Sequence, residues 1–283
     1  MFRDDALEGK TILVTGGGSG LGLSMSQRFA SLGAKVAITG RDAGRLEKAA
    51  GQIDATGERV HTHPADVRDF AAVEAAVASV TERWGGIDVL VNNAAGNFLA
   101  PTEDLSPNGF NAVVSTVLNG TFHATLAVGR GMIARKQGGS ILNIVTTYAW
   151  TGSAFVIPSA AAKAGVLAMT RSLAVEWATY GIRSNAIAPG PFPTEGAWSA
   201  LMPTPEIEAE AKARIPFGRF GRHEELTNLA AFLVSDAAPY INGEVVTIDG
   251  GEWIASGGEF NGLTRVPREH FKAAMQAMRG KKG

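Results

Sequence analysis

The sequence predicts an α/β fold with one doubly wound, parallel sheet of seven strands and helices on both faces. Three observations lead to this prediction. Short β-branched runs recur along the chain, stretches with helical spacing of apolar residues separate them, and the runs themselves are largely apolar. A parallel sheet requires such strands, because right-handed crossovers place helices on each face and bury both.

Seven runs are predicted to form the strands, and the third of them is the weakest. They lie at residues 11–15, 35–39, 60–63, 88–92, 140–145, 182–187 and 244–248. After the third run, Val73, Val77 and Val80 follow one another at helical steps, which put their side chains on one face of a helix. Strand and helix therefore alternate nearly throughout the chain.

The 283 residues are interpreted as a single domain, because nothing in the composition marks a break between two. A hydrophobic share of 45% with 19% charged residues indicates a globular protein with a large core. We expect a C-terminal extension from about residue 252, with a glycine-rich loop after Ser256 and a short helix over 268–278.

The charge and the cysteine content narrow the classes of partner. Twenty-six basic and 27 acidic residues leave a net charge of −1, which gives no reason to expect nucleic acid or an anionic membrane. The absence of cysteine excludes thiolate metal sites, and His61 and His63 lack a third ligand, so no metal site is expected. Neither a signal-peptide pattern nor a membrane-spanning run is visible, and we expect a cytoplasmic protein.

A glycine-rich loop, "TGGGSGLG" from Thr15 to Gly22, follows the first predicted strand and opens the first helix. Its glycines at 16, 20 and 22 permit a sharp turn and close approach to a phosphate, which the start of the helix stabilises. Alone, such a loop could be a flexible turn. After the first strand of an α/β pattern it predicts dinucleotide binding, as in Rossmann folds.

The residue after the second strand indicates which dinucleotide is bound. Enzymes that use NAD tend to carry an acidic residue there, whereas this chain has Arg41, which could pair with a 2′-phosphate. We therefore predict NADP(H). The alternative is that Arg41 is a solvated residue at a helix start whose N-cap is Asp42. Asp66 ends the third strand, where it would meet the adenine.

Together these motifs resemble the short-chain dehydrogenase/reductase family. The matching segments are "TGGGSGLG", the "DV" at Asp66, "NNAAG" from Asn92, an asparagine at 119, Lys163 and "APGP" from Ala188. The family places a tyrosine proton donor four residues before the lysine and a serine on the preceding strand. In this chain those two positions hold Ser159 and Thr146.

A narrower resemblance, to the 2,4-dienoyl-CoA reductases of that family, accounts for the missing tyrosine. These enzymes also have serine at that position and place a tyrosine eleven residues earlier, which is Tyr148 here. "NNAAGNF", "LSPN", "AAKAGV" and the tail "SGGEFN" match as well, so the similarity runs from about Gly9 to beyond Val266.

The resemblance implies roles for four catalytic side chains. The hydroxyl of Tyr148 and the amide of Asn97 would stabilise negative charge on a thioester oxygen, Lys163 would hold the nicotinamide ribose, and Ser159 would hydrogen-bond within the site. Simpler readings remain for three of them. Tyr148 could be an interface or core aromatic, Asn97 could stabilise its own loop, and Ser159 could be a helix N-cap.

The remaining site predictions concern the cofactor and the substrate. The expected cofactor contacts are Thr15, Gly16, Ser19, Gly20, Leu21, Gly22, Arg41, Asp66, Val67, Asn93, Ala94, Lys163, Pro189, Gly190 and Phe192. The resemblance points to Arg68, Phe98 and Ser106 as acyl-CoA contacts. It also finds Ala200 where mammalian relatives have a basic residue, which weakens the expectation about CoA binding.

The function that the resemblance implies is NADPH-dependent reduction of 2,4-dienoyl-CoA thioesters to 3-enoyl-CoA in unsaturated fatty acid degradation, by a homotetramer. Two alternatives stay open. One is a reductase or dehydrogenase that acts on another enoyl-CoA or on a carbonyl compound with the same cofactor site. The other is a non-catalytic NADP-binding sensor.

Overall fold

The computed structural model describes residues 3–194 and 204–280, and seven parallel strands form its central sheet. All seven predicted strands are present, and their ends differ from the predicted ends by no more than two residues. The strands are β1 (Thr11–Thr15), β2 (Lys35–Gly40), β3 (Val60–Pro64), β4 (Val89–Asn92), β5 (Gly139–Ile144), β6 (Ile182–Pro189) and β7 (Val245–Ile248).

The strand order is β3-β2-β1-β4-β5-β6-β7, and every neighbouring pair is parallel. The chain first moves outward from β1 to β3, then returns to the other side of β1 and continues outward from β4 to β7. The direction reverses between β1 and β4, and ligands of doubly wound sheets bind outside the carboxyl ends of the strands at that point.

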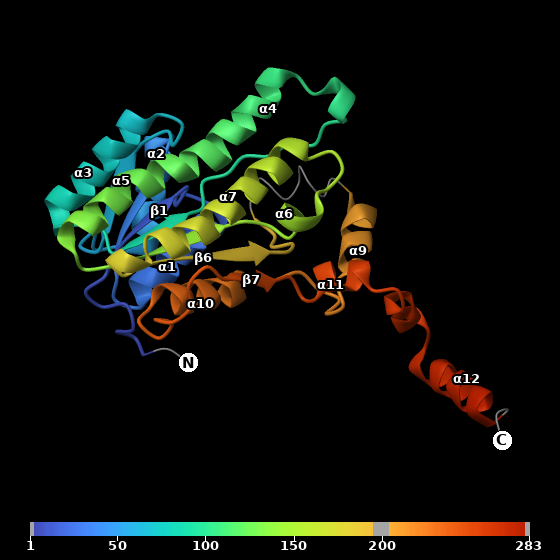
Figure 1. Ribbon diagram of the computed structural model, residues 1–283. Coiled ribbons are helices and arrows are strands. Elements are labelled where there is room, and N and C mark those ends of the chain that lie inside the picture. The colour runs from blue at the N-terminus through green and yellow to red at the C-terminus, as the bar shows by residue number, and fades with distance from the viewer. Residues whose placement is uncertain (1–2, 195–203, 281–283) are drawn as a thin grey trace.

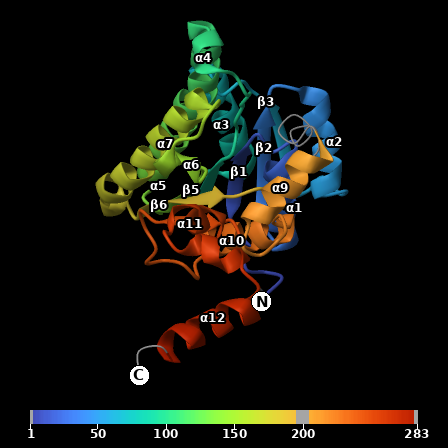
Figure 2. The same ribbon diagram turned by 90° about the vertical axis from the view of Figure 1, so that its right-hand side faces the viewer.

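Helices cover both faces of the sheet, as Figure 1 and Figure 2 show. The inward side chains of α1 and α10 pack on one face, and those of α3, α5 and α7 pack on the other. The α-helices are α1 (Gly20–Ser31), α2 (Ala43–Ile53), α3 (Phe70–Trp84), α4 (Pro107–Val114), α5 (Gly120–Arg135), α6 (Tyr148–Thr151), α7 (Ile157–Glu176), α9 (Pro205–Arg214), α10 (His223–Val234), α11 (Glu252–Gly257) and α12 (Arg268–Gly280).

One helical stretch is long and apolar enough, by length and composition alone, to cross a membrane. It runs over Pro107–Arg135 and consists of α4, the π-helical turn η2 (Ser115–Asn119) and α5. Its α5 part packs against α3 and buries Ala124, Val128 and Met132 in the cluster beneath the sheet. This is how a core helix of a globular domain packs.

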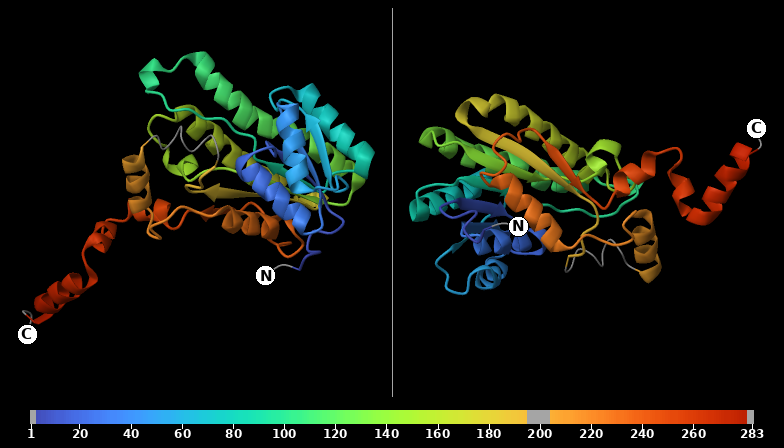
Figure 3. Two further views of the ribbon diagram at one scale, coloured as in Figure 1. Left: turned by 180° about the vertical axis from the view of Figure 1, so that it is seen from behind. Right: turned by 90° about the horizontal axis from the view of Figure 1, so that it is seen from below.

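The C-terminal extension leaves the body of the protein after β7. Helix α11 lies next to α9, the 3₁₀ turn η4 (Asn261–Arg265) follows, and α12 projects away from the sheet (Figure 1, Figure 3). The predicted helix over 268–278 is present as α12, which ends two residues later than expected.

Candidate active site

A cleft of about 1840 Å³ opens at the carboxyl ends of the strands. The glycine-rich loop, the segments that follow β2, β4, β5 and β6, and helix α11 form its walls. Most of the predicted site residues line it together. They are Gly16, Ser19, Gly20, Leu21, Arg41, Asp66, Val67, Asn93, Ala94, Asn97, Phe98, Tyr148, Ser159, Lys163, Pro189, Gly190 and Phe192.

The glycine-rich loop has the shape of a phosphate cradle. Gly16 and Gly20 adopt φ angles of +65° and +53°, which side chains rarely allow. A Cβ at Gly22 would lie 2.3 Å from the carbonyl oxygen of Gly16, so α1 packs directly on the loop. Gly20 and Leu21 in the first turn of α1 line the cleft, and the N-cap Ser19 makes no side-chain capping bond. These features fit a dinucleotide pyrophosphate at the start of α1.

Two predicted cofactor contacts, Thr15 and Gly22, lie behind the cleft wall. The hydroxyl oxygen of Thr15 accepts hydrogen bonds from the backbone N–H groups of Asn93 (3.0 Å) and Ala94 (3.1 Å). In return, the Asn93 amide donates to the carbonyl oxygens of Thr15 and Gly16 at 3.1 and 3.2 Å. Thr15 therefore joins the loops after β1 and β4, and Gly22 supplies the close packing of α1.

Two arginines line the cleft near the end of β2: Arg41, directly after the strand, and Arg45, in the first turn of α2. Asp42 is the N-cap of α2, and its side chain accepts from the Arg45 backbone N–H at 3.0 Å. The capping role that the sequence suggested for Asp42 is thus present, together with a cleft position for Arg41. Sequence reasoning missed Arg45, although its position four residues after Arg41, in the first turn of a predicted helix, was a usable signal.

Asp66 and Arg68 form a close ion pair with 2.6 Å between Oδ2 and Nη2. Hydrogen bonds from Arg68 lower the pKa of the Asp66 carboxyl. Asp66 lines the main cleft, whereas Arg68 lines a smaller adjoining pocket of about 540 Å³. Asn119 also lines that smaller pocket, and Thr116 of the same π-helical turn lines the main cleft. Arg68, expected as an acyl-CoA contact, therefore lies beside the main cleft and not in its lining.

The side chains of Tyr148 and Ser159 contact each other in the wall of the cleft. Tyr148 begins the short helix α6, and its hydroxyl lies 3.0 Å from the Ser159 hydroxyl, with either group able to donate. Ser159 is buried in the first turn of α7. It is not the N-cap, as one reading of the sequence had it, because α7 already begins at Ile157 and Pro158 occupies the first turn.

Lys163 lies one helical turn after Ser159 and is buried in the same wall. Its ammonium donates a hydrogen bond to the carbonyl oxygen of Ile144, at the end of β5. Burial lowers the pKa of the Lys163 ammonium to about 8. Thr146, which occupies the strand-serine position of the family pattern, is also buried and lines the same cleft.

The loop after β4 carries Asn97 and Phe98 into the cleft. No hydrogen bond joins the Asn97 side-chain amide to another residue of the described part of the chain, so the amide does not stabilise its own loop there. The backbone N–H of Ala100 donates to the Phe155 carbonyl oxygen at 3.0 Å and ties this loop to the segment between α6 and α7.

Ser106 does not line the main cleft or the adjoining pocket. It is the N-cap of α4, and its hydroxyl oxygen accepts from the Gly109 backbone N–H at 3.0 Å. Ala200, where the sequence departs from the relatives' pattern, lies outside the described residues.

Sequence reasoning also missed α11, which brings Trp253 and Ile254 of the extension to the cleft.

A family model described as enoyl-(acyl carrier protein) reductase matches residues 16–252. A Bacillus subtilis (strain 168) protein is 47% identical over 249 residues, which cover 88% of this chain and 98% of the relative. Its name is probable 2,4-dienoyl-CoA reductase, (2E)-enoyl-CoA-producing. A Caenorhabditis elegans protein is 43% identical over 256 residues, covering 89% of this chain and 83% of the relative, and its name specifies a (3E)-enoyl-CoA product.

Solved structures agree with these relatives. A short-chain dehydrogenase from Bacillus anthracis superposes with a TM-score of 0.81 at 46% identity, covering 87% of this chain and 97% of its own. A gluconate 5-dehydrogenase from Burkholderia cenocepacia J2315, in complex with NADP and tartrate, has a TM-score of 0.83 at 35% identity, with coverage of 88% and 97%. With the fold, the loop geometry and these matches over most of its length, the chain belongs to the short-chain dehydrogenase/reductase family of nicotinamide-dependent oxidoreductases.

Proposed function

We propose that the protein is an NADPH-dependent 2,4-dienoyl-CoA reductase that serves the degradation of unsaturated fatty acids. The observation that carries the proposal is the 3.0 Å contact between the hydroxyls of Tyr148 and Ser159, in the wall that also holds Lys163. The chain has Ser159 where the family usually has tyrosine, and the contact supports the proposal that the Tyr148 phenol takes over the role of donor. The names of relatives such as the B. subtilis protein supply the substrate class.

The residues of the cleft fit stabilisation of an enolate oxygen. A bound NADPH would supply the hydride for the far end of the conjugated diene. Negative charge then develops on the thioester oxygen, where donors lower the barrier. Tyr148 and Asn97 provide a hydroxyl and an amide in the same cleft, and Ser159 accepts from or donates to the phenol and so orients it.

The position of the new proton decides the product. Protonation next to the thioester leaves the double bond between carbons 3 and 4 and gives a 3-enoyl-CoA, which is the product we propose. The names of the relatives differ on this point, because one specifies a (2E) product and others a (3E) product. Product analysis is therefore part of the test.

The preference for NADPH rests on the two arginines after β2. Arg41 makes no hydrogen bond or ion pair with the described residues, and it lines the cleft together with Arg45, whose guanidinium lies 4.0 Å from the Asp42 carboxylate. Paired guanidinium groups at this position suit a 2′-phosphate. One of the solved relatives holds NADP, which supports the same choice.

We further propose that the enzyme is a cytoplasmic homotetramer that takes acyl-CoA thioesters. The lack of cysteine is compatible with a reducing compartment, and the assembly follows the resemblance to the subfamily. Exposed apolar side chains on the outer helices, such as Phe122 on α5 and Val175 on α7, would be covered in such an assembly.

The decisive experiment follows the oxidation of NADPH and of NADH with 2,4-dienoyl-, 2-enoyl- and 3-ketoacyl-CoA thioesters. We expect turnover with NADPH and the dienoyl-CoA, with a 3-enoyl product identified by NMR. Turnover only with the other thioesters or with free carbonyl compounds would replace the substrate assignment. Tight NADPH binding without oxidation by any substrate would indicate a sensor.

A further inference from the structure

Two tryptophans stack between the helix that carries Tyr148 and the C-terminal extension. Trp150 is on α6 and Trp253 is on α11, and their ring centroids lie 4.9 Å apart with 26° between the planes. Trp253 lines the cleft, whereas Trp150 does not. The pair therefore connects α11, which forms part of the cleft wall, to α6, which carries Tyr148.

Helix α6 needs such support because it has only four residues. A single helical turn fixes many dihedral angles for few hydrogen bonds and does not persist without tertiary contacts. One side of Trp150 packs with the apolar cluster that α4 and α7 bury against the sheet. The other contact of known geometry is the stack on Trp253.

The partner helix α11 is held firmly on its own side. The carboxylate of Asp249 accepts from the backbone N–H groups of Gly251 (2.8 Å) and Trp253 (2.7 Å), which fixes the first turn of α11. Glu252 pairs with Arg214 of α9 at 3.7 Å. Trp253 thus stands on a helix that is anchored independently of α6.

We propose that Trp253 is a positioning residue, which braces Trp150 and thereby holds the Tyr148 hydroxyl at Ser159. The brace comes from the extension, because the family model matches only as far as residue 252. The inference rests on the proposed role of Tyr148 in the reduction. It assigns to the extension a part in aligning the donor, beyond forming a wall of the cleft.

The test is a double-mutant cycle on the two rings. Trp253→Ala and Trp150→Ala are each expected to lower kcat roughly 10-fold, as the loss of one aromatic pair predicts, while the Kd for NADPH stays within about 2-fold. Because both changes break the same contact, the double variant should lose no more than either single variant. Trp253→Phe keeps a ring on α11 and should recover most of kcat.

The matched control is Trp84→Ala. Trp84 packs edge-on against His61, with centroids 5.8 Å apart, and neither residue lines the cleft. This variant loses an aromatic contact of similar size, so it should lower the melting temperature without changing kcat. Additive effects of the two substitutions in the stack, an unchanged kcat in Trp253→Ala, or an equal loss in Trp84→Ala would each overturn the brace.

A second measurement separates this inference from the substrate assignment. Amide hydrogen exchange at residues 147–152 should become faster in both alanine variants of the stack and stay unchanged in Trp84→Ala, whatever the substrate is. If the wild type reduces no dienoyl-CoA but exchange responds in this way, the proposed function fails and the brace stands. If the wild type is active and exchange at these residues does not respond, the brace fails alone.

Discussion

Tyr148 and Ser159 lie eleven positions apart in the sequence and share one hydrogen bond at the cleft wall, because α6 and α7 both follow β5 and begin at the same edge of the sheet. Ser159 is too short to reach as far into the cleft as a phenol would from the same position. Tyr148 supplies the longer side chain from α6 instead. The wall keeps a phenol, a hydroxyl and an ammonium, with the phenol carried by a different element.

Removal of the Tyr148 hydroxyl is the direct test of its role. Tyr148→Phe should reduce kcat roughly 100- to 1000-fold, the usual cost of losing one donor to a developing oxyanion, in steady-state assays with the dienoyl-CoA. The Kd for NADPH should remain within about 2-fold, since the ring is kept. Tyr180→Phe, at an exposed residue away from the cleft, is the control. A Tyr148→Phe enzyme with normal turnover would contradict the mechanism.

Lys163 should make the reaction sensitive to alkaline pH. Burial lowers its pKa from 10.5 to about 8, so the charge on the free enzyme is lost as the pH rises through about 8. We expect kcat/KM to fall over this range. The unfolded chain keeps the proton up to the ordinary pKa of 10.5. Because the unfolded state then binds more protons than the folded state, the contribution of Lys163 to the free energy of unfolding should rise with pH between about 8 and 10.5.

An NMR titration of the lysine side chains measures the Lys163 pKa directly, with Lys163→Met to assign the signal. A midpoint near 10.5, the ordinary lysine value, would show that burial does not control this group.

Arg41 should discriminate between the two nicotinamide cofactors. Arg41→Ala removes a cation that would pair only with the 2′-phosphate, so the Kd for NADPH should rise roughly 10- to 100-fold while that for NADH changes less than about 2-fold. Arg130→Ala, which breaks the surface pair with Glu74, is the control for loss of one positive charge. Equal losses for both cofactors would refute the 2′-phosphate assignment.

At the scale of helices and strands, periodicity and loop chemistry in the sequence were sufficient to predict all seven strands and the terminal helix. The strands of a parallel sheet are buried on both faces and are therefore continuous apolar runs, which are visible in the order of residues along the sequence. The glycine-rich loop could also be predicted, because glycines at fixed spacing indicate a backbone that must turn sharply and pack closely.

The sequence could not reveal contacts between segments far apart in the chain. The residues around Thr15 in the sequence do not indicate that its side chain joins two loops. Likewise, no local pattern indicates that Trp150 stacks on Trp253, about a hundred residues later. For Ser106 the local signal was present, because a serine before a proline indicates a helix N-cap. The family resemblance instead assigned it to the substrate. Such assignments need the positions of whole elements relative to one another.

His223 couples two elements that enclose the cofactor site. Its Nε2–H donates to the Pro193 carbonyl oxygen at 2.7 Å, and its Nδ1 lies 2.7 Å from the Ser24 hydroxyl on α1. Thr194, which follows Pro193, is adjacent to Gly20 of the glycine-rich loop. The imidazole therefore fixes the segment after β6 against α1.

Loss of this coupling should weaken cofactor binding more than catalysis. His223→Ala is expected to raise the Kd for NADPH roughly 3- to 10-fold, as the loss of one or two hydrogen bonds predicts, with kcat nearly unchanged. His61→Ala is a matched control, because His61 also pairs with a serine, Ser79 at 2.8 Å, but does not line the cleft. If both variants bind NADPH equally well, the coupling has no part in cofactor binding.

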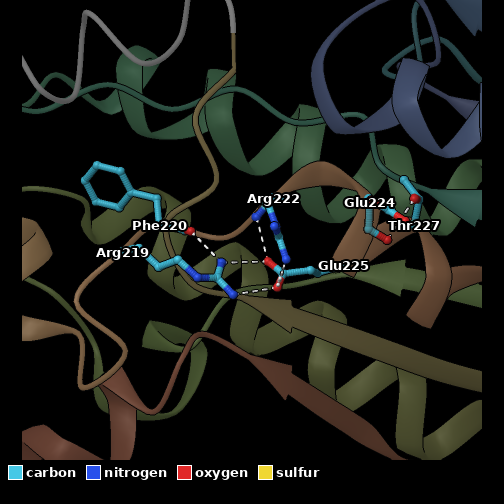
Figure 4. Close-up of polar contacts among 6 residues, drawn as sticks. All are labelled: Arg219, Phe220, Arg222, Glu224, Glu225 and Thr227. Carbon is cyan, nitrogen blue, oxygen red and sulfur yellow. Dashed lines mark hydrogen bonds and ion pairs between the residues drawn. The ribbon is translucent and has the colours of Figure 1, made fainter.

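At the scale of the whole molecule, the charged cluster of Arg219, Arg222 and Glu225 lies next to the cleft and contributes to the stability of the fold. Figure 4 shows Arg219 and Arg222 converging on the carboxylate of Glu225, in the first turn of α10. Arg219 donates to both carboxylate oxygens at 2.7 and 2.9 Å, and the Arg222 backbone N–H donates to one of them at 2.8 Å. Nearby, a Cβ at Gly221 would lie 2.3 Å from the Phe192 ring, so this segment packs against the cofactor site.

This cluster should make the fold sensitive to acid. Hydrogen bonds from Arg219 and the Arg222 backbone lower the pKa of Glu225 to about 2. A carboxylate with a lowered folded-state pKa stabilises the fold above its ordinary pKa of 4.5 and loses that contribution as the pH falls towards 2. Glu225→Gln keeps an oxygen that can accept from the Arg222 backbone N–H but loses the ion pair with Arg219. It should therefore reduce the free energy of unfolding by up to about 1 kcal/mol at pH 7, the upper end for an exposed ion pair. The difference from wild type should shrink between about pH 4.5 and 2 in denaturant titrations at each pH. Glu224→Gln, at the neighbouring residue whose backbone carbonyl accepts from Thr227, is the control, because it removes a carboxylate from the same helical turn and leaves the Arg219–Glu225 pair in place (Figure 4). A constant difference between Glu225→Gln and wild type at all pH values would show that the ion pair does not set the acid stability.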